Sequence, residues 1–73
     1  MSVEYILTHT EEKILRGLAS GQQSKEIADS IGRSTATVEF HVRTLYLKLG
    51  ARSRAQLVAR GYERGYLPQN AKI

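Results

Sequence analysis

The sequence predicts an all-α domain of four short helices with a helix-turn-helix at its centre. Apolar residues recur every three or four positions in four successive segments, which is the period of an amphipathic helix. Glycines or small hydroxyl residues stand at the segment ends, and no stretch alternates apolar and polar residues as a strand would. The 73 residues predict one domain over residues 1–73, with its core at about 6–67 and a frayed tail at 68–73.

The first helix is expected over residues 9–20. Thr8 and Glu11 have the spacing of a capping box, in which each side chain accepts a hydrogen bond from the other residue's backbone amide. Leu7 precedes this cap and is expected to pack on the first turns, and Gly21 ends the segment. The apolar residues at helical spacing are Ile14, Leu15 and Leu18.

The second and third helices are expected to follow closely. The second begins at Gln23 or Ser24 and ends at Gly32, because glycine adopts a positive φ at little cost. Ser34 is a favourable N-cap for the third helix, over residues 35–49. The apolar face of the second helix is Ile27, Ala28 and Ile31. The buried stripe of the third is Val38, Val42, Leu45 and Leu49.

The fourth helix is expected to start after Gly50, which ends the third. Ser53 is its predicted cap, and the helix extends to about Arg64. Gly65 ends it, and Pro68 prevents it from resuming. Its apolar side is Leu57, Val58 and Tyr62.

The middle of the chain has the residue types of a helix-turn-helix. Two helices that cross closely need a small residue at the crossing, a turn residue without a Cβ, and a compact β-branched anchor in the second helix. Ala28, Gly32 and Val38 meet these needs at positions five, nine and fifteen counted from Ser24. Together with a basic outer face, this spacing predicts nucleic-acid binding.

The charge is divided unevenly along the chain. The net charge is +4, but residues 1–32 carry −2 and residues 33–73 carry +6. A basic half-chain favours a polyanionic partner, either nucleic acid or an anionic membrane. No large exposed apolar face opposes the basic residues, which argues against the membrane.

Enzymatic function is not expected. The sequence holds no cysteine, which excludes disulfides, thiolate metal sites and cysteine nucleophiles. It has no nucleophile–base pair and no phosphate-binding glycine loop, and His9 has no metal-ligand partner at useful spacing. We expect no cofactor, no metal, no small-molecule ligand within this chain, and a cytoplasmic, nucleoid-associated location.

The third helix is expected to turn a mixed face outward, formed by Ala36, Glu39, Phe40, Arg43 and Leu47. In a major groove, Arg43 is suited to guanine, Glu39 to the cytosine amino group and Phe40 to a thymine methyl. Two alternatives remain open: Glu39 and Arg43 pair with each other at i, i+4, or Phe40 folds back onto the first or second helix.

Residues that flank this face are expected to contact phosphates. They lie at the N-termini of the second and third helices, and at and beyond the far end of the third. They are Ser24, Lys25, Ser34, Thr35, Thr37, Lys48, Arg52 and Arg54.

These residues resemble the LuxR/GerE-type helix-turn-helix domain over about residues 6–67, including NarL/FixJ-like output domains. The motifs that carry the resemblance are Leu7-Thr8, Glu11-Glu12, Ile14-Leu15, Leu18-Ala19, Gly21, Lys25-Glu26-Ile27-Ala28, Ser34, Thr37-Val38, His41, Lys48-Leu49 and Arg54. The resemblance implies a transcriptional regulator whose third helix reads bases through Glu39, Phe40 and Arg43. It also implies phosphate contacts by Ser24, Lys25, Thr35, Thr37 and Lys48.

The resemblance further implies a homodimer on double-stranded DNA. The contact lies on the fourth helix near Ala55, Val58, Ala59 and Tyr62, although Val58 and Tyr62 suit the core equally well. Two positions depart from the family pattern. Glu39 stands where a basic residue is usual, which bears on site preference, and Arg33 stands where an apolar one is usual, which adds a phosphate contact.

Several alternatives are left open by the sequence. The chain is either a stand-alone GerE-like regulator or the excised output domain of a longer protein. A sigma-factor promoter-reading domain is the nearest rival within DNA binding, with RNA polymerase as a candidate partner. A protein-binding regulator that forms helix-mediated heterodimers is the rival from another class.

Overall fold

The computed structural model describes residues 6–68 and contains four α-helices in this range. They are α1 (His9–Ala19), α2 (Ser24–Ile31), α3 (Thr35–Leu49) and α4 (Arg54–Glu63). The prediction of an all-α, four-helix domain is confirmed. The predicted frayed tail lies outside the described residues except for Pro68, which is exposed.

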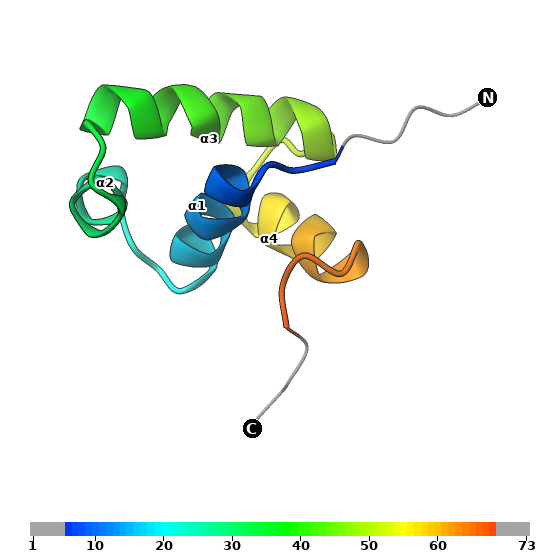
Figure 1. The fold of residues 1–73 in the computed structure, drawn as a ribbon. Helices are drawn as coiled ribbons and strands as arrows, with labels where there is room; N and C mark the ends of the chain where they lie inside the picture. The colour runs from blue at the N-terminus through cyan, green and yellow to red at the C-terminus, as the bar shows by residue number, and fades with distance from the viewer. Residues whose placement is uncertain (1–5, 69–73) are drawn as a thin grey trace.

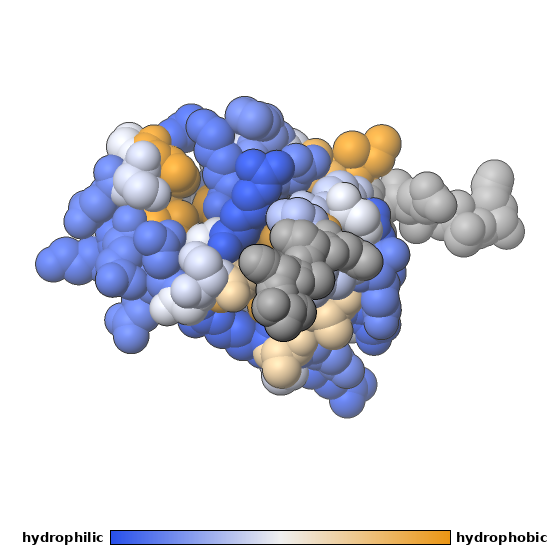
Figure 2. All heavy atoms as spheres, turned by 90° about the horizontal axis from the view of Figure 1, so that it is seen from below, coloured by the Kyte–Doolittle hydropathy of each residue, from blue (hydrophilic) through white to orange (hydrophobic). Residues whose placement is uncertain are grey.

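The helix α3 lies along one side of the molecule, with the other three helices beneath it (Figure 1). The helix α1 packs against α2, α3 and α4, whereas α2 and α4 do not pack against each other. The face away from α3 is mostly hydrophilic where it is visible, with apolar side chains in separate small areas (Figure 2).

The helix ends follow the predicted capping chemistry. The Thr8 hydroxyl accepts a hydrogen bond from the Glu11 amide at 3.1 Å, and the Thr8 amide donates to Glu11 Oε1 at 2.9 Å. Gly32 and Gly50 close α2 and α3 with φ values of +71° and +64°, where a Cβ would be strained. The sequence predicted α1 and α4 to extend one residue further than they do, because Ser20 and Arg64 are the C-caps of these helices.

Ser34 and Ser53 cap α3 and α4 as predicted, each accepting a hydrogen bond from the amide three residues later. A hydroxyl cap of this kind stabilises a helix by about 1 kcal/mol relative to alanine. The local sequence therefore places the start of α3.

A single apolar core lies between α1 and the other helices. Its fully buried large side chains are Ile14, Leu15, Ile27, Val38, Leu45, Leu49 and Leu57. Leu7 is buried beside the cap as predicted, and Val42 and Val58 are only half-buried. Leu67, which follows α4 outside any helical repeat, is 4% exposed and completes the core. Tyr62 is 39% exposed, so it does not belong to the core.

Two glycines within helices allow neighbouring segments to approach closely. A Cβ at Gly17 of α1 would lie 2.7 Å from Ile27 Cγ1, and one at Gly61 of α4 would lie 2.9 Å from Leu67 Cδ1. Neither glycine has a positive φ, so packing rather than backbone conformation requires it. Sequence analysis did not identify either position.

We predict that Gly17→Ala destabilises the domain. Alanine gains up to about 1 kcal/mol of helix propensity, but overpacking against the buried Ile27 costs about 1–3 kcal/mol. Urea unfolding measures the net effect, with Lys13→Ala on the exposed side of α1 as the control, expected within about 0.5 kcal/mol of wild type. A Gly17→Ala protein more stable than wild type would contradict the close approach.

Candidate nucleic-acid interface

The outer face of α3 is open to solvent. Ala36, Glu39 and Arg43 are exposed, while Phe40 is 59% and Leu47 is 81% exposed. This orientation follows from the opposite stripe, in which Val38, Leu45 and Leu49 are fully buried against the rest of the core. The predicted division of α3 into a buried and an outward face is thus present in the structure.

Phe40 does not fold back onto α1 or α2. Its ring lies edge-on to the ring of His41 on the same helix, with centroids 5.7 Å apart and an interplanar angle of 67°. The alternative in which Phe40 packs on another helix is therefore wrong. The Phe40 ring is therefore accessible to a partner at this face.

Glu39 and Arg43 do not form the i, i+4 ion pair that the sequence left open. Among residues 6–68, ion pairs join Glu12 to Arg16, Glu11 to Lys48, and Arg60 to Glu63. The side chains of Glu39 and Arg43 have no hydrogen-bonding partner within this range. Both groups can therefore donate or accept hydrogen bonds to an external partner without first breaking an internal contact.

An open groove of about 500 Å³ runs beside Glu39 and is lined by residues of all four helices. Ser24 and Lys25 line it from the first turn of α2, and Arg54 lines it from the first turn of α4. The remaining lining residues are Leu18, Gln23, Thr35, Val42 and Tyr46. The groove thus brings together predicted base-contacting and phosphate-contacting residues that are distant in the sequence.

The predicted phosphate-contacting residues fall into two groups: those whose side chains have no hydrogen bond within the described residues, and an engaged group whose side chains do. Lys25, Arg33, Thr35 and Arg52 are exposed, and no hydrogen bond or ion pair within the described residues engages their side chains. Ser24 and Thr37 are half-buried. The Ser34 hydroxyl is already engaged, because it accepts from the Thr37 amide at 3.1 Å and donates to the Thr37 hydroxyl at 2.9 Å.

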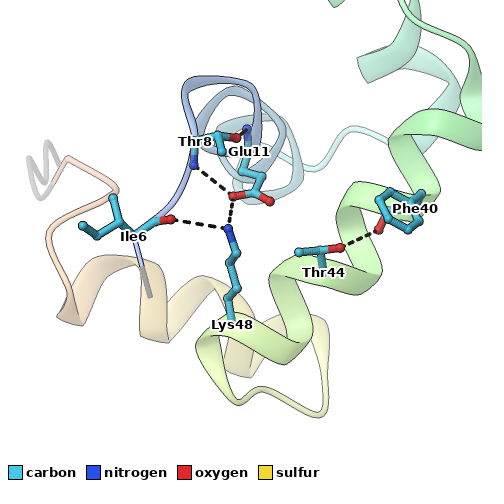
Figure 3. Close-up of polar contacts among 6 residues, drawn as sticks. All are labelled: Ile6, Thr8, Glu11, Phe40, Thr44 and Lys48. Atoms are coloured by element: carbon cyan, nitrogen blue, oxygen red, sulfur yellow. Dashed lines mark hydrogen bonds and ion pairs between the residues drawn. The ribbon is translucent and has the colours of Figure 1, made fainter. Parts of the chain in front are cut away.

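Lys48 belongs to the engaged group. Its Nζ donates to Glu11 Oε1 at 2.7 Å and to the carbonyl oxygen of Ile6 at 3.3 Å (Figure 3). The Glu11 side chain is 5% exposed and that of Lys48 is 22% exposed. This ion pair ties the C-terminal end of α3 to the start of α1, so Lys48 has a structural role that the sequence did not reveal.

The same contacts set the ionisation of Glu11. Burial by itself raises the pKa of this carboxyl, but hydrogen bonds from Lys48 and Thr8 and the positive charge of Lys48 together lower the pKa below its ordinary value. The Glu11 carboxyl group is thus a stronger acid in the folded domain than in the unfolded chain.

Arg54 is also engaged in the structure. Its Nε and Nη2 donate to the carbonyl oxygen of Leu18 at 3.2 and 2.6 Å, and Nη2 also donates to that of Gln22 at 2.8 Å. The guanidinium therefore joins the first turn of α4 to the connection between α1 and α2.

The predicted dimer residues do not share one environment. Ala55, Ala59 and Tyr62 are exposed on one side of α4, whereas Val58 is half-buried and packs against the core. Within residues 6–68, no group of three His, Asp or Glu side chains is arranged to hold a metal ion. No described helix has the length and apolar character needed to cross a membrane.

Comparison with known proteins shows the family. Residues 5–60 match the family described as "Bacterial regulatory proteins, luxR family". The chain belongs to the LuxR family. Its sequence is 39% identical over 61 residues to the transcriptional regulatory protein YdfI of Bacillus subtilis, covering 84% of this chain and 29% of YdfI.

Two solved structures of Vibrio cholerae VqmA resemble this LuxR-family chain. The VqmA dimer in the absence of target DNA has a TM-score of 0.77 at 36% identity, covering 84% of this chain and 28% of VqmA. The VqmA–ligand–DNA complex has a TM-score of 0.76 at 33% identity, covering 90% and 29%. The chain thus spans less than a third of the length of these relatives.

We predict that stability falls in acid because of Glu11. The pKa of Glu11 in the folded domain lies below its ordinary value of 4.5. Its ionised form therefore contributes fully to the free energy of unfolding above pH 4.5, and this contribution is lost as the pH falls through the folded pKa. Urea unfolding from pH 7 to pH 3 should show a smaller acid-induced loss in Glu11→Gln than in wild type. Glu12→Gln, which removes a carboxylate from the same turn, is the control. Equal pH profiles for wild type and Glu11→Gln would contradict this role.

Proposed function

We propose that this chain binds double-stranded DNA sequence-specifically, with α3 in the major groove, and thereby regulates transcription. One observation carries the proposal: the outer face of α3 presents Glu39, Phe40 and Arg43, exposed and without an internal polar partner. Membership of a family of regulatory proteins supports it. The similarity to VqmA, which has been solved in complex with DNA, supports it further.

The chemistry of the α3 face suits direct readout of bases. The Arg43 guanidinium matches the O6 and N7 acceptors of guanine, and the Glu39 carboxylate accepts from the amino group of cytosine. The Phe40 ring offers an apolar contact to a thymine methyl. An acidic residue so close to phosphates repels them, which makes Glu39 a discriminating group rather than a source of affinity.

Phosphate contacts on both sides of this face would hold α3 in register. Lys25, Arg33 and Arg52 provide unpaired charge, and the exposed start of α3 offers its free amides together with Thr35. Ser24, Ser34 and Thr37 complete this set at the first turns of α2 and α3. Lys48 and Arg54 already hold internal acceptors, so a phosphate must share or displace those contacts.

A homodimer would place two copies of α3 on two half-sites. The exposed Ala55, Ala59 and Tyr62 form the proposed contact, with Val58 at its edge. The two alanines allow close approach of two α4 helices, and Tyr62 supplies contact area. RNA polymerase is a candidate partner of the bound dimer, and the nucleoid is the proposed location. The proposal assigns the chain no catalytic step.

Selection of bound duplexes from a random pool tests the proposal. A consensus with two repeats of one half-site would support sequence-specific binding by a dimer. Affinity for the selected duplex should fall steeply as salt is raised, because phosphate contacts release counterions. Enrichment of no sequence, or no duplex binding in dilute buffer, would overturn the proposal and favour the protein-binding alternative.

We predict that Arg43→Ala and Arg52→Ala weaken DNA binding in different ways. Loss of a bidentate guanine contact at Arg43 should cost about 1–3 kcal/mol and relax specificity at one base pair. Loss of a phosphate contact at Arg52 should weaken binding to all sequences alike and reduce the salt slope by about one. Titrations of the selected and of scrambled duplexes at several salt concentrations measure both effects. The same sequence-independent loss in both variants would contradict the assignment of Arg43 to a base.

A further inference from the structure

We propose that Arg54 is a positioning residue that holds the first turn of α2 against the DNA backbone. The inference rests on the proposed function, because it assigns Arg54 to the placement of Ser24 and Lys25 rather than to direct contact with a phosphate. It also makes α4, the proposed dimer helix, a support for α2.

Arg54 stands where its charge is unfavourable for its own helix. It is the first residue of α4, and the positive end of the helix dipole disfavours a cation there by about 0.3–1 kcal/mol. Ser53 already caps this helix through the Gln56 amide, so Arg54 is not needed for capping. The side chain is instead directed across to the segment that leads into α2.

The guanidinium holds this segment at two points. The carbonyl oxygen of Leu18 lies in the last turn of α1, and that of Gln22 lies one residue before the N-cap of α2. Both accept charge-assisted hydrogen bonds from Arg54, with the shortest at 2.6 Å. The planar fork therefore fixes the direction in which the chain enters α2.

The hold extends directly into the first turn of α2. The Gln23 amide, one residue beyond the anchored Gln22 carbonyl, donates to Glu26 Oε1 at 2.8 Å. Ser24 and Lys25 lie between Gln22, which Arg54 holds, and Glu26, which accepts from the Gln23 amide. Both residues line the same groove as Arg54. Because α2 and α4 do not pack against each other, the guanidinium links α4 to the segment entering α2 where no packing between these two helices does so.

Charge and hydrogen-bonding geometry can be separated by substitution. Arg54→Lys keeps the positive charge but replaces the planar fork by a flexible ammonium, and Arg54→Gln removes the charge as well. If Arg54 acts by direct phosphate contact, the Arg54→Lys protein should retain most of the affinity for DNA and most of its salt dependence. If it acts by positioning, Lys should lose affinity almost as Gln does.

A double-mutant cycle with Lys25 identifies the residue through which Arg54 acts. In the wild-type background, we expect Arg54→Lys to weaken binding to the selected duplex about fivefold or more, within the range of coupled residues. In a Lys25→Gln background, the same change should cost less than about twofold. Arg52→Lys, two positions earlier and without an internal side-chain partner, is the matched control and should be additive with Lys25→Gln.

Amide hydrogen exchange gives a second readout that needs no DNA. In Arg54→Lys, protection should fall at the hydrogen-bonded amides of Gln22, Gln23 and Ile27 while the amides of α3 remain protected, which a general loss of stability would not produce. If wild type fails to bind DNA, the proposed function fails but exchange still tests the hold on α2. Wild-type affinity and wild-type protection in Arg54→Lys, or additive effects with Lys25→Gln, would overturn the inference.

Discussion

The arrangement depends on the burial of one aliphatic stripe of α3. Val38, Leu45 and Leu49 are fully buried, and each such side chain contributes about 1.5–3 kcal/mol relative to exposure. This burial fixes the rotation of α3, because turning the helix away would expose the stripe. The opposite face, with the exposed Phe40, is consequently left to solvent.

Two long-range polar contacts hold the helices in place relative to one another. The pair of Glu11 and Lys48 joins the start of α1 to the end of α3, and Arg54 joins the start of α4 to the segment before α2. Both contacts use basic side chains that composition alone assigns to the charged surface. A basic residue in this domain is thus not equivalent to a phosphate contact, since part of the positive charge stabilises the fold itself.

Other basic side chains have no internal partner within residues 6–68, and three of them lie on the helix-turn-helix. Lys25, Arg33 and Arg43 come from α2, the turn and α3, and none of them is used by an internal ion pair among the described residues. Their charges are therefore available to the proposed DNA partner. Glu39 within the same surface adds a selective element, because a carboxylate tolerates only a partner that donates hydrogen bonds at that point.

The sequence by itself determined the four helices, their caps and the outward face of α3. These features rest on local rules, namely the helical period, hydroxyl caps and glycine at positive φ, which act over a few residues. Only the tertiary structure decided that Lys48 and Arg54 bind within the chain, that Leu67 completes the core, and that Gly17 must lack a Cβ. Each of these depends on residues brought together by folding from distant positions, such as the 37 residues that separate Glu11 from Lys48. No local pattern encodes such a distance.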